Sequence, residues 1–280
     1  MKALNLIFLP LLLSAVTIEE KTLEEQSFKN KLHLPKGLGL HTDLAYNSYL
    51  IELHSSEVDS AIDYDVLEAT LGLSYAYDKW LFGMYGKFLL KELESNMFVV
   101  TSQSPLNNHA QIDKNEFGLY VNYTLQENSH DAWRLNAIYR YASLDAFDAY
   151  RSFLDYNSHF KYQTNGLAFS LQYQRKVFEK GLLFANAGLL YSQAKVKMSE
   201  SVNGQSQDSF VNDTVKALGS KFSFGYQHSY AQKLSLHIRT DVWRQNFERL
   251  AVTSQVGDSL PKASLKEQSY STYMGLAWRF

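Results

Sequence analysis

The last eleven residues, YSTYMGLAWRF, alternate between two kinds of side chain. Every second position, counted back from the end, is apolar or tolerated by lipid, and these positions are Tyr270, Thr272, Met274, Leu276, Trp278 and Phe280. The positions between them are mostly small, polar or charged. Because successive side chains of a strand point to opposite faces, the segment predicts a β-strand with one face for hydrocarbon and one for water or a packed lumen.

Nine further segments upstream can be interpreted with the same period of two. All ten are long enough to cross a bilayer as tilted strands, which takes about 9 to 11 residues. The ten segments are residues 38–53, 66–77, 80–91, 112–125, 133–144, 160–175, 182–197, 214–228, 234–247 and 267–280.

The links between these segments alternate in length along the chain. Short links lie at 78–79, 126–132, 176–181 and 229–233, and longer links lie at 54–65, 92–111, 145–159, 198–213 and 248–266. Short turns at one end and long loops at the other are typical of membrane barrels. We therefore predict an all-β fold, a transmembrane antiparallel up-and-down β-barrel of ten strands, with both termini at the short-turn end.

Composition agrees with a barrel once its two faces are considered separately. The mean hydropathy of −0.28 resembles that of a soluble domain, but lipid-facing and lumen-facing residues cancel in any average. Aromatic residues make up 14 % of the chain, and barrels concentrate such rings at the membrane interfaces. The rings beside the short turns predict a periplasmic girdle of Tyr75, Tyr77, Trp80, Tyr123, Trp133, Tyr173, Tyr226 and Trp278. A soluble β-sandwich, the alternative fold, has no reason to gather rings there.

The N-terminal region predicts export. An apolar run over residues 3–16 is too short to span a membrane and follows Lys2, so residues 1–15 are predicted to be a signal peptide cleaved after Ala15, with a signal anchor as the alternative. Residues 16–37 contain a capping-box pattern and predict a short helix or arm in the periplasm. The barrel domain is predicted to span residues 38–280. The sequence has no Cys, which excludes disulfides and thiolate metal sites.

Charged residues occupy strand positions that alternate with the lipid-facing ones. The predicted lumen charges are Asp43, Glu68, Lys87, Lys91, Glu116, Arg134, Arg140, Lys221, His237, Arg239, Asp241 and Arg279. A lipid-facing Arg or Lys would cost about 2 to 4 kcal/mol at the midplane, so this segregation supports the face assignment. Two interpretations follow. The charges pair and fill the barrel, as in other small barrels, or their excess of basic groups lines a narrow, weakly anion-preferring channel.

Some outer-membrane barrels are enzymes, and the omptin proteases are the ten-stranded comparison. They activate water between an Asp pair and an Asp-His pair, and Asp63-Tyr64-Asp65 superficially resembles the first pair. The parity of Leu67 places both carboxylates on the outward face unless a bulge intervenes, and the sequence contains no Asp-x-His. We therefore do not expect omptin-like catalysis.

A lipid hydrolase, the other enzymatic alternative, needs a Ser with a His base nearby. Ser158-His159 lies in a long link without an evident acidic partner, and His228-Ser229 lies at a short turn. The eight His are scattered without an H-E-x-x-H motif. The sequence thus predicts no catalytic residues, no metal site and no cofactor.

The terminal aromatic residue resembles the C-terminal signal of bacterial outer-membrane β-barrels, which implies recognition by the outer-membrane assembly machinery. With the polar segment that precedes the first strand, residues 274–280 make the mature chain similar to the solitary autotransporter-like β-barrel proteins of Gram-negative bacteria. Autotransporter translocators have twelve strands, so the alternative is a twelve-stranded barrel with two more strands at 96–102 or 146–154.

These observations predict an integral outer-membrane protein without enzymatic activity and with a structural, surface-interaction or minor permeation role. The expected partners are outer-membrane lipids, lipopolysaccharide and the assembly machinery, and no nucleic acid. The long links, rich in Ser, Asn, Gln and Asp, are the expected contact surface, because binding groups favour loops on rigid scaffolds. No ligand or solute can be named.

Overall fold

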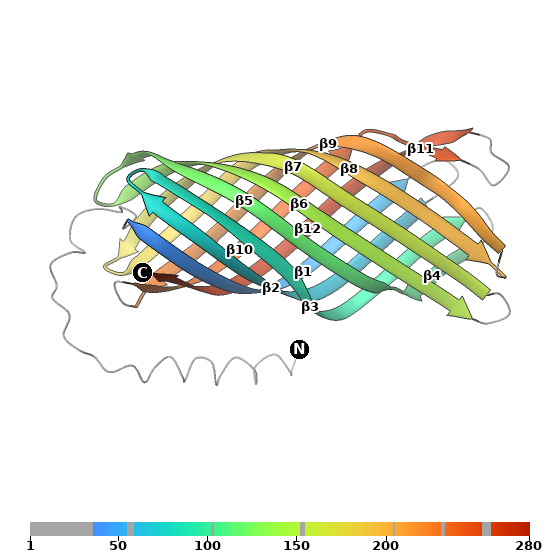
Figure 1. Ribbon diagram of the computed structural model, residues 1–280, viewed down its shortest axis with the longest axis horizontal. Helices are drawn as coiled ribbons and strands as arrows, with labels where there is room; N and C mark the ends of the chain where they lie inside the picture. The colour runs from blue at the N-terminus through green and yellow to red at the C-terminus, as the bar shows by residue number, and fades with distance from the viewer. Residues whose placement is uncertain are drawn as a thin grey trace. The chain divides into compact units, whose positions relative to one another are not determined.

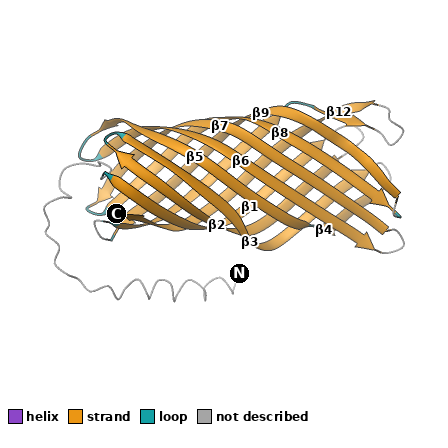
Figure 2. Cartoon of the chain, in the orientation of Figure 1, coloured by secondary structure: helices purple, strands orange, loops and turns teal. Residues whose placement is uncertain are grey.

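The computed structural model describes residues 36–54, 59–101, 104–151, 155–203, 205–230, 233–253 and 259–280. The predicted signal peptide and all but the last two residues of the predicted arm lie outside these ranges. Strands account for nearly all of the described chain, as Figure 2 shows. No helix in this part of the chain is long and apolar enough to span a membrane.

Ten antiparallel strands close into a barrel, which confirms the predicted fold class (Figure 1). Each strand pairs with the next along the chain, and the ring closes where β1 pairs with β12, from Gly39 opposite Arg279 to His54 opposite Ser264. The ring consists of β1 (Gly37–His54), β2 (Asp59–Tyr77), β3 (Trp80–Thr101), β5 (Gln111–Glu127), β6 (Asp131–Arg151), β7 (Asp155–Phe178), β8 (Gly181–Val202), β9 (Gln205–Ser229), β10 (Leu234–Phe247) and β12 (Ser259–Arg279).

Two short strands extend members of this ring. Strand β4 (Ser104–His109) pairs with the far end of β3 and leads into β5 through Ala110. Strand β11 (Leu250–Thr253) follows β10 and pairs with β12. The twelve-stranded alternative is therefore wrong: residues 96–101 belong to β3 and residues 146–151 belong to β6.

The strands are much longer than a membrane crossing requires. Nine of the ten ring strands span 17 to 25 residues, about twice the 9 to 11 that a tilted crossing needs. The expected long outer loops are consequently wrong, because most of their residues continue the strands. Of the short turns, 78–79 is a two-residue hairpin link, and Asp78 adopts the left-handed conformation (φ 52°) that such turns favour.

The polarity of the wall reverses along each strand, and β1 illustrates it. In its first half Leu38 and Leu40 face outward and are exposed, whereas Asp43 faces inward and is buried. Beyond Tyr46 the apolar positions change face, and Ile51 is buried inside the barrel. One half of the barrel is thus apolar outside and polar inside, as a membrane-spanning wall requires, and the other half is the opposite.

Aromatic rings mark both limits of the apolar band. At the short-turn end Trp80 packs on Tyr123 and Trp133 on Tyr173, with ring centroids 4.5 and 4.8 Å apart. All eight predicted girdle residues lie outward on strand ends there, and we call this set the short-turn girdle. Where the polarity reverses, exposed tyrosines form an outer girdle that sequence analysis did not predict, consisting of Tyr46, Tyr141, Tyr191 and Tyr270. The membrane-spanning part lies between the two girdles.

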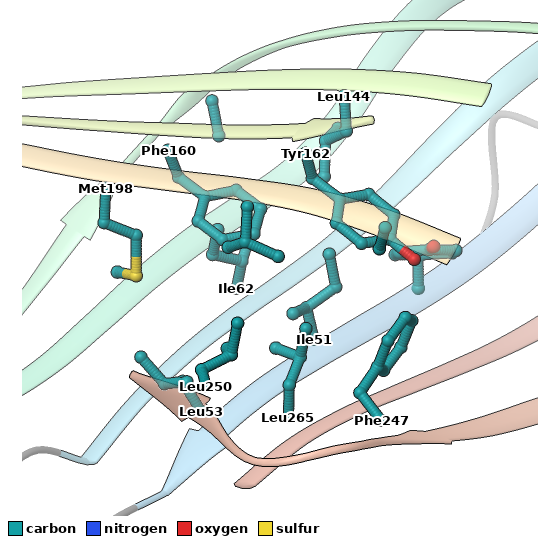
Figure 3. Close-up of a cluster of buried hydrophobic side chains, with 14 of the residues drawn as sticks. Ile51, Leu53, Ile62, Leu144, Phe160, Tyr162, Met198, Phe247, Leu250 and Leu265 are labelled. Carbon is teal, nitrogen blue, oxygen red and sulfur yellow. The ribbon is translucent and has the colours of Figure 1, made fainter. Parts of the chain in front are cut away.

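Beyond the outer girdle the barrel contains an ordinary apolar core. Figure 3 shows side chains from opposite strands converging on one another across the lumen. We call this cluster the apolar plug, and it comprises Tyr49, Ile51, Leu53, Ile62, Tyr64, Val66, Ala110, Ile112, Leu144, Ala146, Phe160, Tyr162, Ala194, Val196, Met198, Val215, Ala217, Phe247, Leu250, Ala263 and Leu265. Outside the membrane the protein is therefore packed like a small soluble barrel, with its polar face toward water.

Candidate functional site

The terminal strand closes the barrel. Tyr270, Thr272, Leu276, Trp278 and Phe280 are exposed on the outward face, and Met274 is half-buried on the same face. The backbone N–H of Phe280 donates to the carbonyl of Leu38 at 2.9 Å, so the chain end belongs to the β1–β12 seam.

The predicted lumen charges all face inward except Lys91. The register of β2 with β3 shifts where Glu68 lies opposite Leu89 but Leu67 lies opposite Lys91, which leaves Leu90 as an extra residue. A β-bulge of this kind moves the following side chains to the other face, and Lys91 is exposed on the outward face beside Leu67. The prediction for Lys91 is therefore wrong.

Lys114 provides an inward cation that sequence analysis missed. It lies two residues before Glu116 on β5, so it shares the inward parity, and only 4 % of its side chain is exposed. Because Lys114 and Glu116 are two positions apart, the inward assignment of Glu116 could have identified Lys114 as inward from the sequence. Its Nζ lies 4.5 Å from the ring centroid of Tyr49 and 5.7 Å from that of Tyr64, directly beneath the apolar plug.

An ionic network crosses the lumen below the plug. Glu68 lies 3.0 Å from Lys114 Nζ, and Glu116 accepts from Arg140 Nε at 3.0 Å and from the Tyr85 hydroxyl at 2.8 Å. Lys87 Nζ lies 3.8 Å from both Glu68 and Glu116 and therefore links the two pairs. These groups come from β2, β3, β5 and β6, so side chains from four strands converge here.

The network continues toward the short-turn end through Lys87, which donates to the Tyr273 hydroxyl at 3.1 Å. The Arg239 guanidinium stacks over the Tyr273 ring at 4.2 Å, and its Nε lies 3.0 Å from Asp241. Asp241 also contacts Lys221 at 3.2 Å.

Closer to the short turns, Asp43 and His237 form a separate pair at 2.8 Å. Arg134 is buried, and Arg279 lies at the end of β12. Seven of the predicted lumen charges thus belong to one network with Lys114. The other inward charges are the Asp43–His237 pair and the two arginines toward the short-turn end, Arg134 and Arg279.

Inward rings rest on glycines of the neighbouring strand. A Cβ added to Gly118 would clash with the ring of Tyr85, and one added to Gly72 would clash with the ring of His41. Gly118 thus leaves room for the Tyr85 ring against the wall, from where the Tyr85 hydroxyl donates to Glu116.

A cavity of about 70 Å³ lies beside the ionic network. Its charged lining consists of Lys87, Lys114, Glu116, Arg140, Lys221 and Asp241. Gly166, Ala168 and Ser192 of β7 and β8 supply small residues opposite. Trp243 also lines the cavity, and its ring packs 4.1 Å from the Arg140 guanidinium.

The omptin-like Asp pair does not face a cleft. Asp63 and Asp65 lie on the outward parity of β2, while Tyr64 between them is buried in the plug. Asp65 accepts a hydrogen bond of 2.5 Å from the Tyr46 hydroxyl of the outer girdle. Burial, followed by the charges of Asp65 and Glu94, raises the pKa of Asp63.

The Ser-His pairs do not form nucleophile–base pairs either. Ser158 is buried on the inward face, whereas the neighbouring His159 lies outward and contacts Asp145. His228 lies near the short turns and contacts the Tyr226 hydroxyl at 3.0 Å. In the part of the chain that the structure describes, no group of three or more metal-ligating side chains converges.

Comparison with known proteins gives a match at the level of fold. No family model and no curated protein matches the sequence. The outer membrane protease OmpT from Escherichia coli superposes with a TM-score of 0.65 and 12 % identity over 93 % of this chain and 99 % of that chain. The translocator domain of the autotransporter NalP from Neisseria meningitidis gives a TM-score of 0.49 and 11 % identity over 89 % and 90 % of the two chains. At these identities the OmpT likeness shows the fold alone, that of an outer-membrane β-barrel.

Proposed function

We propose that the chain is a closed, non-conducting barrel of the bacterial outer membrane whose extended outer wall serves as a surface-interaction scaffold. The observation that carries this proposal is the double filling of the lumen, by the apolar plug at one level and by the ionic network at the next. The scaffold is rigid because its outer wall is built from strands that continue past the membrane.

The channel alternative has less support. A conducting pore needs a continuous aqueous path with weak, accessible sites. Tyr64, Phe160 and Leu265 of the plug are each at most 1 % exposed, and the cations below them are engaged by Glu68, Glu116 and Asp241. Pairing of this kind removes most of the anion preference expected from an excess of basic groups.

The experiment that tests the closed barrel is conductance in planar lipid bilayers. We expect the refolded chain to insert without steady single-channel steps. A variant with Phe160→Ser and Leu265→Ser, checked for retained heat-modifiable migration on gels, provides the matched control, because it removes packing from the plug alone. Reproducible steps from the unaltered protein would overturn the proposal.

A cationic surface above the outer girdle supports outer-membrane lipids and lipopolysaccharide as partners. Exposed cations on the outward face of β7 to β12 form what we call the basic arc, namely Lys161, Lys195, Lys197, Lys216, Arg244 and Lys266. Lys161 lies directly opposite Lys197, an arrangement that is unfavourable unless anions lie nearby. Asp145, 3.3 Å from Lys161, provides only part of that charge. Phosphates of lipopolysaccharide would supply the rest, since each Lys or Arg near an anionic surface contributes about 1 kcal/mol.

This partner is tested by charge reversal on the basic arc. In the triple variant Lys195→Glu, Lys197→Glu and Lys216→Glu we expect added lipopolysaccharide no longer to raise the thermal unfolding midpoint in detergent micelles. The matched control reverses three exposed lysines near the short turns, Lys79, Lys180 and Lys233. Equal stabilisation of both triple variants would refute the basic arc as the contact surface.

We further propose that the chain is exported through a signal peptide at residues 1–15 and that the assembly machinery recognises its terminal strand. The outward rings of Trp278 and Phe280 at the barrel seam support the second point. We propose no enzymatic activity, because Asp63 and Asp65 lie on the outward face of β2 and Tyr64 between them fills the lumen. The ten-strand ring argues against the autotransporter-like resemblance, since translocators of that family have twelve strands.

A further inference from the structure

We infer that the cavity beside the ionic network is a binding site for a small anion, of halide, oxyanion or short carboxylate size. This site is independent of the proposed surface role, because it lies inside the lumen, at the level of the outer girdle, whose Tyr191 also lines it. Such a site would bind an anion inside the lumen of a barrel that does not conduct.

The charge balance around the cavity favours an anion. Four cationic side chains line it, those of Lys87, Lys114, Arg140 and Lys221, against two carboxylates, Glu116 and Asp241. Both carboxylates already have partners: Glu116 contacts Arg140, Tyr85 and Lys87, and Asp241 contacts Lys221 and Arg239. Glu68 behind Lys114 adds one negative charge, and Arg239 beside Asp241 adds one positive charge. Five cations against three carboxylates leave an excess of two positive charges, which corresponds to Lys221 and Arg239, whose side chains are 28 % and 31 % exposed. An anion in the cavity would compensate this excess.

A buried amide donor also points to a ligand. Gln245 lines the cavity and is 1 % exposed, and its Oε1 accepts a hydrogen bond of 2.6 Å from Ser192 Oγ. Within the described part of the chain its Nε2 has no hydrogen-bond partner. Buried polar groups are nearly always paired, so this donor indicates a missing acceptor.

The size of the cavity fits such a ligand. A volume of about 70 Å³ accommodates several waters or one small anion with part of its hydration shell. The space exists because Gly166 and Ala168 of β7 place almost no side chain opposite the cations. At Gly166 an added Cβ would also clash with the backbone and Cβ of Ser192, so the close approach of β7 and β8 maintains this wall.

Tryptophan fluorescence tests the site directly. Trp243 lines the cavity, whereas the other three tryptophans belong to the short-turn girdle. Iodide, a small anion that quenches tryptophan on contact, should give a saturable component of quenching with the full-length protein in micelles. We expect this component to be absent from Trp243→Phe, displaced by sulfate, and not produced by the cationic quencher Cs⁺.

Cavity variants distinguish occupancy from general accessibility. Ala168→Leu fills the space without changing a charge and should abolish the saturable component, whereas its control, Ala187→Leu, lies on the outward face and should leave it unchanged. Lys221→Gln should weaken iodide binding by about tenfold. Each variant is first checked for heat-modifiable migration. Linear quenching that is identical in Trp243→Phe, or equal quenching by Cs⁺, would overturn the inference.

Discussion

At the scale of single residues, Glu267 is a carboxyl group of the outer half that is buried beside Tyr162 of the apolar plug. It is fully buried on β12, and its Oε2 accepts a hydrogen bond of 2.7 Å from the Tyr162 hydroxyl, while its Oε1 has no partner among the described residues. Burial alone raises the pKa of Glu267 well above its usual value of 4.5. The folded barrel therefore favours the protonated acid.

Glu267 should make stability fall as pH rises above about 4.5. The unfolded chain releases this proton near pH 4.5, whereas the folded chain retains it up to its raised pKa. Between the two values the free energy of unfolding should decrease by up to about 1.4 kcal/mol per pH unit. Glu267→Gln should remove this contribution, so its stability relative to the unaltered protein should grow with pH.

Urea unfolding followed by tryptophan fluorescence at pH 4, 6 and 8 measures this effect. Glu248→Gln is the control, because Glu248 is exposed. A constant difference between Glu267→Gln and the unaltered chain across this range would contradict the assignment. The predicted last strand begins at Glu267, and only the plug around it reveals that its side chain is buried.

At the scale of one element, strand β1 contains three environments that a single substitution can distinguish. Leu40 faces lipid, Leu50 faces outward beyond the outer girdle, and Leu53 belongs to the apolar plug. Leu40 lies directly opposite Trp278 of the short-turn girdle and not at the midplane, so we expect Leu40→Arg to cost about 1 kcal/mol. We expect Leu50→Arg to cost less than about 0.5 kcal/mol. Leu53→Arg should cost at least as much as Leu40→Arg, because the charge would be buried without a partner.

Equilibrium unfolding of the three variants in one detergent gives the ranking. Similar costs for Leu50→Arg and Leu40→Arg would mean that the membrane extends to Leu50 and that Tyr46 does not mark its limit. Leu50→Gln serves as the control for loss of the side chain alone.

The same strand explains which parts of the fold could be predicted from the sequence. The alternation in residues 38–53 establishes a strand, and the charges at Asp43 and its equivalents establish which face is inside. Beyond Tyr46 the apolar positions move to the other parity, as at Tyr49 and Ile51. In β2 most of this second alternation falls in the segment 54–65 that was interpreted as a link, although Ile62 and Tyr64 show it clearly. In other strands, such as β7, it lies inside the predicted segment, at Phe160 and Tyr162, where the change of face was not recognised.

The bulge in β3 shows a different limit. Leu90 is an apolar residue in an alternating strand, and nothing in its neighbours distinguishes an extra residue from a paired one. Parity counted through such a residue fails until a second bulge, here at Leu93, restores it, which is why Lys91 was misplaced. The ionic partners were also beyond sequence analysis, because Lys87, Glu68 and Glu116 come from three strands whose relative stagger depends on barrel closure.

At the scale of the whole molecule, the strand count was predictable because it depends on the order of short and long links, which bulges do not alter. The length of the barrel was not predictable, since it depends on where along each strand the polarity reverses. The outer half behaves as a soluble barrel fused end to end with a membrane barrel. Its stability comes from burial of plug residues such as Phe160 and Tyr162, whereas the membrane half relies on lipid contact and on the ionic network.

Hydrogen exchange tests this architecture across the molecule. If the outer half is a packed barrel, the amides of residues 49–53, 160–164 and 194–198 should exchange as slowly in micelles as those of the membrane half, because both are opened only by loss of strand pairing. If those segments were surface loops, their amides would exchange within seconds. Mass spectrometry of peptic fragments compares the two halves in one sample. The variant Phe160→Ser, Leu265→Ser should accelerate exchange in the outer half alone, because the plug is the part of the interior that it alters. Uniform acceleration would instead mean that the two halves unfold as one cooperative unit.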